Sequence, residues 1–145
     1  TENIYLQGRQ DTYPKRRGLT RVKELNDNHI NVCFAQDSIS DPWYPLGNGN
    51  MMNILDHGIH ICQMMSFDEI DNALDLITIN GAKTMNLDDV YGIEVGKDAN
   101  FIVINAKSEF EAVCERVGVL ASIRNGKYLF NKIPEKVNTD IEFLS

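Results

Sequence analysis

Apolar positions repeat with a helical period through the middle of the chain. From residue 50 to residue 65 they recur every three or four positions, as expected for a helix with one buried face. Ser66, followed by Glu69 three residues later, predicts the start of a further helix, because these two side chains can form a capping box. Shorter helical patterns cover residues 20–26, 77–85 and 108–116. The central part of the chain is therefore expected to be mostly helical.

Three other segments have the composition of β-strands. Residues 30–36 form a nearly continuous apolar run rich in β-branched side chains, which is typical of a strand buried on both faces. Residues 100–104 and 119–130 form two further runs, and the second is broken at Asn125-Gly126, a dipeptide typical of tight hairpin turns. The pattern thus predicts one buried strand before the helices and a small antiparallel unit after them.

Composition and charge narrow the possible partners and location. The 145 residues include 14 Lys and Arg against 21 Asp and Glu, a formal net charge of -7, which argues against a nucleic-acid partner. No apolar run reaches the roughly 20 residues of a membrane-spanning helix, so we expect a soluble protein without a membrane partner. The three cysteines, Cys33, Cys62 and Cys114, are widely spaced and odd in number, which predicts no disulfide framework and a cytoplasmic location.

Two candidate site residues follow the predicted strand 30–36. Asp37 lies just past its carboxyl end, where parallel α/β folds and barrels place catalytic groups, although a loop aspartate that caps a turn is an equally good interpretation. Trp43 lies in a rigid, proline-bounded aromatic run at residues 41–45. Such a run is suited either to stacking on a flat ring or to packing within an Ω-loop that holds no ligand.

His57 and His60 are a weaker candidate pair. Residues three apart on a helix share a face, but a metal site needs at least one further ligand, and helical histidines at this spacing are more often surface residues. The sequence also lacks the paired H-x-E and P-C-x-x-C motifs of the small zinc nucleobase deaminases.

Several separate segments match the motifs of one enzyme family, in the same order along the chain. They are residues 3–9, 11–18, 20–24, 30–34, 41–47, 60–63, 76–78, 91–93 and 125–127. The most specific is the run Asp41-Pro42-Trp43-Tyr44-Pro45-Leu46-Gly47. On these residues the chain resembles the C-terminal part of bacterial cytosine deaminases of the amidohydrolase superfamily, and the resemblance extends to about Pro134.

The resemblance implies an α/β fold. Enzymes of this family are TIM barrels with a small β-sandwich domain. Residues 1–90 would then be the C-terminal part of the barrel, with its last strand at about 30–36 followed by helices. Residues 91–145 would be part of the sandwich domain and a C-terminal tail.

The resemblance also implies a reaction. The family hydrolyses cytosine to uracil and ammonia with a divalent metal, iron or zinc, held by an H-x-H pair, two further histidines and an aspartate. Asp37 matches that aspartate, which binds the metal and takes a proton from the attacking water, and Trp43 matches the residue that packs against the pyrimidine base. The other ligands are expected upstream of this chain. A cytoplasmic enzyme of pyrimidine salvage, homo-oligomeric when full length, is the implied context.

Departures from the family pattern leave two alternatives open. Relatives read Gly-His-Asp-Asp where this chain reads Ala35-Gln36-Asp37-Ser38, and Ser40 replaces a usual aromatic residue. These changes beside the site allow an amidohydrolase that acts on another cyclic amidine or amide. Together with the missing ligands, they also allow a truncated or decayed module without catalytic activity.

Overall fold

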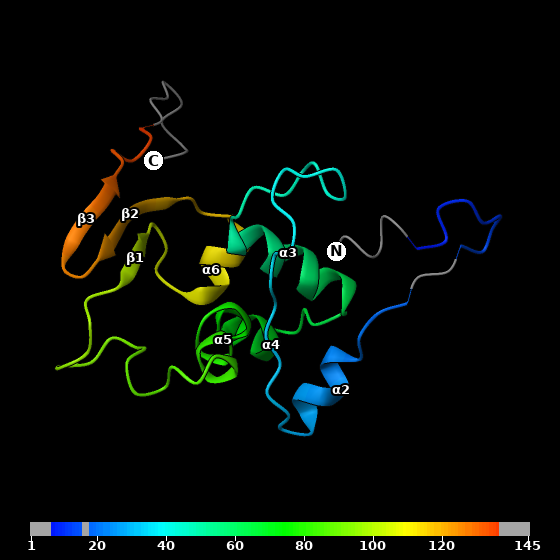
Figure 1. Cartoon of the computed structure of the whole chain (residues 1–145), viewed down its shortest axis with the longest axis horizontal. Coiled ribbons are helices and arrows are strands. Elements are labelled where there is room, and N and C mark those ends of the chain that lie inside the picture. The colour runs from blue at the N-terminus through cyan, green and yellow to red at the C-terminus, as the bar shows by residue number, and fades with distance from the viewer. Residues whose placement is uncertain (1–6, 16–17, 137–145) are drawn as a thin grey trace, which may run out of the picture.

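The described residues form a group of short helices and a three-stranded antiparallel sheet, joined by irregular segments (Figure 1). The structure is a computed structural model that describes residues 7–15 and 18–136. Its helices are α2 (Val22–Asp27), α3 (Met51–Ile61), α4 (Phe67–Asp71), the 3₁₀ helix η1 (Ala73–Ile77), α5 (Ile79–Thr84) and α6 (Glu109–Cys114). Its strands are β1 (Phe101–Ile104), β2 (Val119–Arg124) and β3 (Lys127–Asn131). In Figure 1 the sheet and α2 lie at opposite sides of the helical group. No helix in the described ranges is long and apolar enough to cross a membrane.

Helix α3 is the centre of the hydrophobic core. Its first turn is capped by Asn50, whose side chain accepts a hydrogen bond from the Met52 N–H (3.0 Å). Leu55 and Ile59 on its inner face are almost completely buried, at 0% and 1% exposure. Around them pack Val22, Met64, Ala73, Leu76 and Val113, contributed by α2, the segment after α3, η1 and α6. The helix predicted over residues 50–65 is confirmed, although it ends four residues earlier.

The helical region after α3 is divided into short pieces. The predicted capping box is confirmed, since Ser66 and Glu69 cap the N-terminus of α4 reciprocally. Helix α4 ends at Asp71, and η1 and α5 follow as separate elements. Short pieces of this kind bend the chain, so that Ala73 and Leu76 of η1 can reach the core beside α3.

Segment 30–36 does not form the strand that its composition predicts. It is extended, and it is held mainly by contacts to η1 and α5: the Phe34 N–H donates to the Leu76 carbonyl (2.7 Å), and Asn80 Nδ2 donates to the Val32 carbonyl (2.9 Å). Ile30 is half exposed. A strand requires a neighbouring strand to complete its hydrogen bonds, and no described residue supplies one here.

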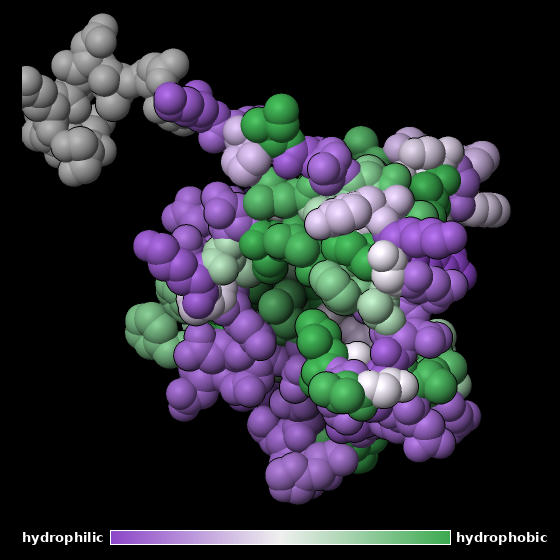
Figure 2. Space-filling view, turned by 90° about the vertical axis from the view of Figure 1, so that its left-hand side faces the viewer, coloured by the Kyte–Doolittle hydropathy of each residue, from purple (hydrophilic) through white to green (hydrophobic). Residues whose placement is uncertain are grey.

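The C-terminal sheet follows the predicted hairpin. Strand β2 pairs with β1 on one side and β3 on the other, both antiparallel. Asn125 and Gly126 connect β2 and β3 with φ values of 49° and 73°, as a two-residue type I′ turn requires. Figure 2 views the molecule from the side of the sheet and shows apolar side chains exposed among polar ones. Exposed apolar strand residues include Phe101, Ile102, Val103, Tyr128, Leu129 and Phe130. The sheet thus buries only part of its apolar surface within the described residues.

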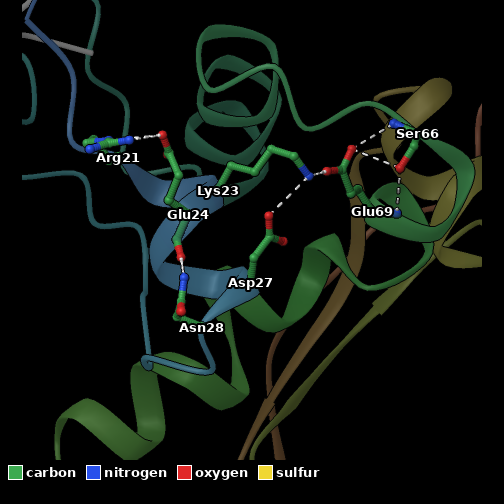
Figure 3. A network of polar contacts seen from close by, with 7 residues as sticks. All are labelled: Arg21, Lys23, Glu24, Asp27, Asn28, Ser66 and Glu69. Atoms are coloured by element: carbon green, nitrogen blue, oxygen red, sulfur yellow. Dashed lines mark hydrogen bonds and ion pairs between the residues drawn. The ribbon is translucent and has the colours of Figure 1, made fainter.

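A polar network links α2 to α4 (Figure 3). Lys23 of α2 forms an ion pair with Glu69 of α4 and lies 3.7 Å from Asp27 of its own helix. Glu69 also accepts hydrogen bonds from the Ser66 N–H (3.0 Å) and hydroxyl (2.8 Å). The Lys23 ammonium, followed by the Ser66 backbone N–H, lowers the pKa of Glu69 from 4.5 to about 2. The charged form of Glu69 is therefore stabilised by the fold.

Replacement of Glu69 tests this network. A carboxyl group whose pKa is depressed in the folded state contributes stability above its unfolded pKa and loses it as pH falls toward the folded value. We expect Glu69→Gln to lower the free energy of unfolding by about 1 kcal/mol at pH 7, a small value because Lys23 is half exposed. The difference in free energy of unfolding between the unmodified protein and the Glu69→Gln variant should shrink as pH falls from 4.5 to about 2. Denaturant titrations across this range measure it. Asp27→Asn is the control and should change little, and an equal effect of both variants at every pH would contradict the assignment.

Gly58 gives a second prediction about packing. A Cβ atom at this position would lie 2.4 Å from Cε2 of the Phe34 ring, so α3 and segment 30–36 approach closely here. We expect Gly58→Ala to cost about 1–3 kcal/mol of stability from overpacking, despite the better helix propensity of alanine. Gly81→Ala in α5, where no atom lies within 4 Å, is the matched control and should stabilise by about 0.5–1 kcal/mol. Thermal denaturation distinguishes the two, and equal stabilisation would show that the Phe34 contact is not tight.

Candidate functional site

Asp37 lies in a strained turn at the end of segment 30–36. The Ser38 N–H donates to the Gln36 carbonyl (2.8 Å), which closes a three-residue turn with Asp37 at its centre. The φ of Asp37 is 62°, a conformation that is rare for a residue with a side chain. Gln36 and Ser38 on either side are buried, whereas Asp37 is exposed. The turn therefore holds the Asp37 carboxylate out from the surface while its neighbours anchor the backbone, and strain of this type is often found at functional sites.

The loop after Asp37 is closed by its own hydrogen bonds. Asp41 Oδ1 accepts from the backbone N–H groups of Trp43 and Tyr44 (both 2.9 Å). The Tyr44 N–H is the main cause that lowers the pKa of Asp41. Ser40 donates to the Gly47 carbonyl through its N–H and its hydroxyl (both 2.8 Å). The loop is consequently fixed in one conformation without help from a ligand.

Gly47 allows the two ends of this loop to touch. A Cβ atom there would lie 2.1 Å from the Ser38 carbonyl oxygen, which is closer than any side chain permits. Only glycine fits this approach. Sequence reasoning did not identify Gly47 or Asp41 as loop-closing residues. The signal was present in Asp41, because an aspartate two residues before the aromatic pair is a common way to start such a turn.

Trp43 is carried on this closed loop with 65% of its surface exposed. The loop combines the two interpretations that the sequence left open, since it is a compact Ω-shaped loop that also presents a free aromatic face. A rigid, exposed indole is well suited to stack on a flat ring.

The described residues offer one potential metal ligand at this site. The Asp37 carboxylate makes no hydrogen bond or ion pair with any residue in the described part of the chain, so it is free to bind a cation. Among those residues no three His, Cys, Asp or Glu side chains gather closely enough to hold a metal. An aspartate is a suitable ligand for iron or zinc, and a complete site would need further ligands from outside the described residues.

The histidine pair belongs to a different part of the molecule. His60 Nδ1 lies 2.7 Å from the Asp56 carbonyl, and the Asp56 carboxylate is held by Arg116 through two contacts of 3.1 and 3.2 Å. These contacts join α3 to the residue that follows α6 by two positions. The structure therefore gives Asp56 and His60 a role in holding α3 against the end of α6, whereas His57 is exposed.

A cavity of about 570 Å³ lies along segment 30–36. Its lining includes Val32, Phe34, Ile54, Gly58 and Cys62, together with residues before α2. Asp37 and Trp43 are not among the lining residues. The lining extends along the segment to Ala35, two residues before Asp37.

Comparison with known proteins identifies the chain's relatives. The chain superimposes with a TM-score of 0.90 on 5-methylcytosine deaminase from Klebsiella pneumoniae liganded with 5-fluorocytosine, at 51% identity. The same enzyme liganded with phosphonocytosine gives a TM-score of 0.89 at 50% identity, and both alignments cover 95% of this chain. N-isopropylammelide isopropyl amidohydrolase from Pseudomonas sp. (strain ADP) is 32% identical over 108 residues, or 74% of this chain. The resemblance to cytosine deaminases is confirmed.

This chain corresponds to part of each relative. It spans 33% and 34% of the two Klebsiella structures and 27% of the Pseudomonas protein. The Amidohydrolase family matches residues 2–130, which is most of the chain. On this match, and on the fold and sequence that it shares with 5-methylcytosine deaminase, the chain belongs to the Amidohydrolase family.

Proposed function

We propose that the whole protein is a metal-dependent hydrolase that deaminates cytosine-like bases, and that this chain supplies Asp37 and Trp43 to its active site. The observation that carries the proposal is the 51% identity and 0.90 TM-score to a 5-methylcytosine deaminase whose structure holds a fluorinated cytosine. The free Asp37 carboxylate and the exposed Trp43 ring support it, because a deaminase needs a proton carrier and a surface for a flat base.

Asp37 would act as a metal ligand and a proton carrier. In the reaction, water adds to the carbon that bears the amino group, the carbon–nitrogen bond breaks, and ammonia leaves. A bound iron or zinc ion would supply Lewis acidity for the addition. Asp37 accepts the proton that the attacking water loses and passes it toward the ring. Its exposed position and its lack of a partner among the described residues support both roles.

Trp43 would hold the base. Stacking on a flat heterocycle costs less free energy when the aromatic side chain is already held in place before the ligand binds. The Asp41, Ser40 and Gly47 hydrogen bonds already fix the loop, so binding costs little conformational entropy. A small-molecule pyrimidine base is accordingly the proposed ligand.

The proposed surroundings of the site follow the family. Residues 1–90 would be part of a TIM barrel whose last strand is segment 30–36, and residues 91–145 part of a small β-sandwich domain. The extended shape of segment 30–36, with Ile30 exposed, supports a place beside further strands. A homo-oligomeric, cytoplasmic enzyme of pyrimidine salvage completes the proposal.

The residues beside Asp37 bear on which cytosine-like base is the substrate. Ser38 replaces the aspartate usual in cytosine deaminases, and Gln36 replaces the histidine, so the residues beside Asp37 differ in size and charge. A cytosine with a substituent at C5 is favoured because the Klebsiella enzyme is a 5-methylcytosine deaminase. Other cyclic amidines or amides are the alternative, supported by the 32% identity to an N-isopropylammelide hydrolase.

Replacement of Asp37 tests the catalytic role. In the full-length protein loaded with iron or zinc, we expect Asp37→Asn to lower kcat for ammonia release at least about 100-fold, the usual contribution of a positioned proton carrier. Metal content, measured by atomic emission, should fall as well. Asp71→Asn on the exposed end of α4 is the matched control and should leave both unchanged. Full activity of the Asp37 variant would refute the proposal.

Replacement of Trp43 tests base stacking separately. Stacking of a base on an aromatic side chain contributes about 1–3 kcal/mol, so Trp43→Ala should raise KM about tenfold or more. Trp43→Phe keeps a ring and should recover most of the affinity. Steady-state kinetics on the full-length protein measure both variants. Equal KM values for the Trp43→Ala and Trp43→Phe variants would exclude stacking.

A substrate panel distinguishes the favoured base from its alternatives. We expect 5-methylcytosine to have the higher kcat/KM, and Ser38→Asp to shift the preference toward cytosine because the larger, charged side chain changes the space beside Asp37. Ammonia release from both bases and from cyclic amides gives the ranking. Preference for a cyclic amide would favour the alternative substrate class, and no release from any ring would favour the module without catalytic activity.

A further inference from the structure

Three Asn-Gly dipeptides occur in the chain, beginning at Asn48, Asn80 and Asn125. Asparagine followed by glycine is especially prone to deamidation, because the main-chain nitrogen of glycine can attack the asparagine side-chain amide without hindrance from a side chain. The three dipeptides have the same intrinsic chemistry. The fold gives them different surroundings, so it decides which of them can react.

Asn80 is protected by its helix. It lies in α5, where the regular backbone keeps the Gly81 nitrogen away from the side-chain amide. Its Nδ2 donates to the Val32 carbonyl (2.9 Å), and its own carbonyl accepts from Thr84 Oγ1 (2.8 Å). Ring closure at Asn80 would require α5 to open locally and this contact to break.

Asn125 is protected by the hairpin. The nitrogen that would attack, Gly126 N, donates a hydrogen bond to the Ala99 carbonyl (3.1 Å). The Asn125 N–H donates to Asn100 Oδ1 (2.8 Å), so the turn is held on both sides. Attack would require the turn to leave its conformation between β2 and β3.

Asn48 lacks both forms of protection. Asn48 and Gly49 are exposed, lie outside any helix or strand, and follow the closed loop that ends at Gly47. The Gly49 N–H donates to no acceptor in the described part of the chain, and neither does Asn48 Nδ2. Within the described residues the Asn48 side chain makes one contact, and this contact promotes the reaction. The Asn50 N–H donates to Asn48 Oδ1 (2.9 Å), which polarises the amide and stabilises negative charge as it develops on this oxygen.

We propose that Asn48 is a site of spontaneous deamidation in the folded protein. Gly49 N forms a bond to Asn48 Cγ and loses its proton, the bond from Cγ to Nδ2 breaks, and ammonia leaves. Water then opens the resulting five-membered succinimide ring at either carbonyl. The products are aspartate and isoaspartate at position 48, and the reaction needs no reactant other than water.

The position of Asn48 gives the modification a structural consequence. Asn48 lies two residues before Asn50, the N-cap of α3, and one residue after the end of the loop that carries Trp43. Aspartate would add a negative charge near the N-terminus of α3, which has no acidic residue in its first turn and favours such a charge. Isoaspartate lengthens the main chain by one methylene group and removes the geometry that places Oδ1 on the Asn50 N–H.

Peptide mapping tests the proposal. The full-length protein is incubated at mildly alkaline pH, folded or unfolded in guanidinium chloride, and then cleaved before aspartates. The peptides 41–55, 75–87 and 98–139 each contain one of the three dipeptides. Aspartate at position 48 adds a cleavage point and divides peptide 41–55 into 41–47 and 48–55, whereas isoaspartate leaves the peptide whole and is detected by isoaspartyl methylation. Tandem mass spectrometry locates the amide-to-carboxyl conversion in each product.

Comparison of the two states decides the outcome. In the unfolded chain the three dipeptides should react at similar rates. In the folded chain Asn48 should retain its rate, whereas Asn80 and Asn125 should slow at least tenfold, which corresponds to about 1.4 kcal/mol of local opening free energy. Tenfold slowing at Asn48, or equally fast reaction at either of the others, would overturn the proposal.

A variant assigns the signal within its peptide. Peptide 41–55 also contains Asn50 and Asn53, so conversion there must be traced to position 48. Asn48→Gln should abolish the conversion, because glutamine would have to close a larger and slower-forming ring. The position is exposed, so this variant should fold normally. Conversion that persists in Asn48→Gln would assign the reaction to another asparagine and refute the proposal.

Discussion

Burial of the inner face of α3 is the interaction on which the rest of the structure depends. Leu55 and Ile59 are the largest side chains that are almost fully removed from solvent, and each such side chain contributes about 1.5–3 kcal/mol. Elements from both ends of the chain reach this face, through Val22 of α2 and Val113 of α6. The short helices have little stability of their own, so packing on α3 holds them in place.

The same helix fixes the candidate site. Phe34 packs against α3 where Gly58 has no side chain, which brings the end of segment 30–36 alongside the helix. Asn50 then caps α3 just after the loop that begins at Ser38. Asp37 and Trp43 therefore lie on a short stretch of chain fixed at both ends. A stretch held in this way can sustain the positive φ of Asp37, which an isolated turn would avoid.

Local signals predicted most of the elements. The α3 pattern, the Ser66 capping box and the Asn125-Gly126 turn each depend on residues close together in the sequence, and all three were confirmed. Segment 30–36 has no strand partner among the described residues, because such a partner comes from elsewhere in the fold, and its place as a barrel strand stays a prediction. The division of the helical region after Ser66 was missed, since packing of Ala73 and Leu76 on the core, rather than periodicity, decides it.

The sequence by itself determined the family, the hairpin, the main helix and the choice of Asp37 and Trp43 as candidate residues. These features depend on residue identity and on spacing between residues that are close together in the sequence. Only the tertiary structure decided which side chains are free to act. Asp37 is exposed while Gln36 and Ser38 are buried, His60 is committed to Asp56, and one Asn-Gly pair is open while two are held by hydrogen bonds. The reason is physical, because burial and hydrogen bonding depend on neighbours that chain folding brings together from distant positions.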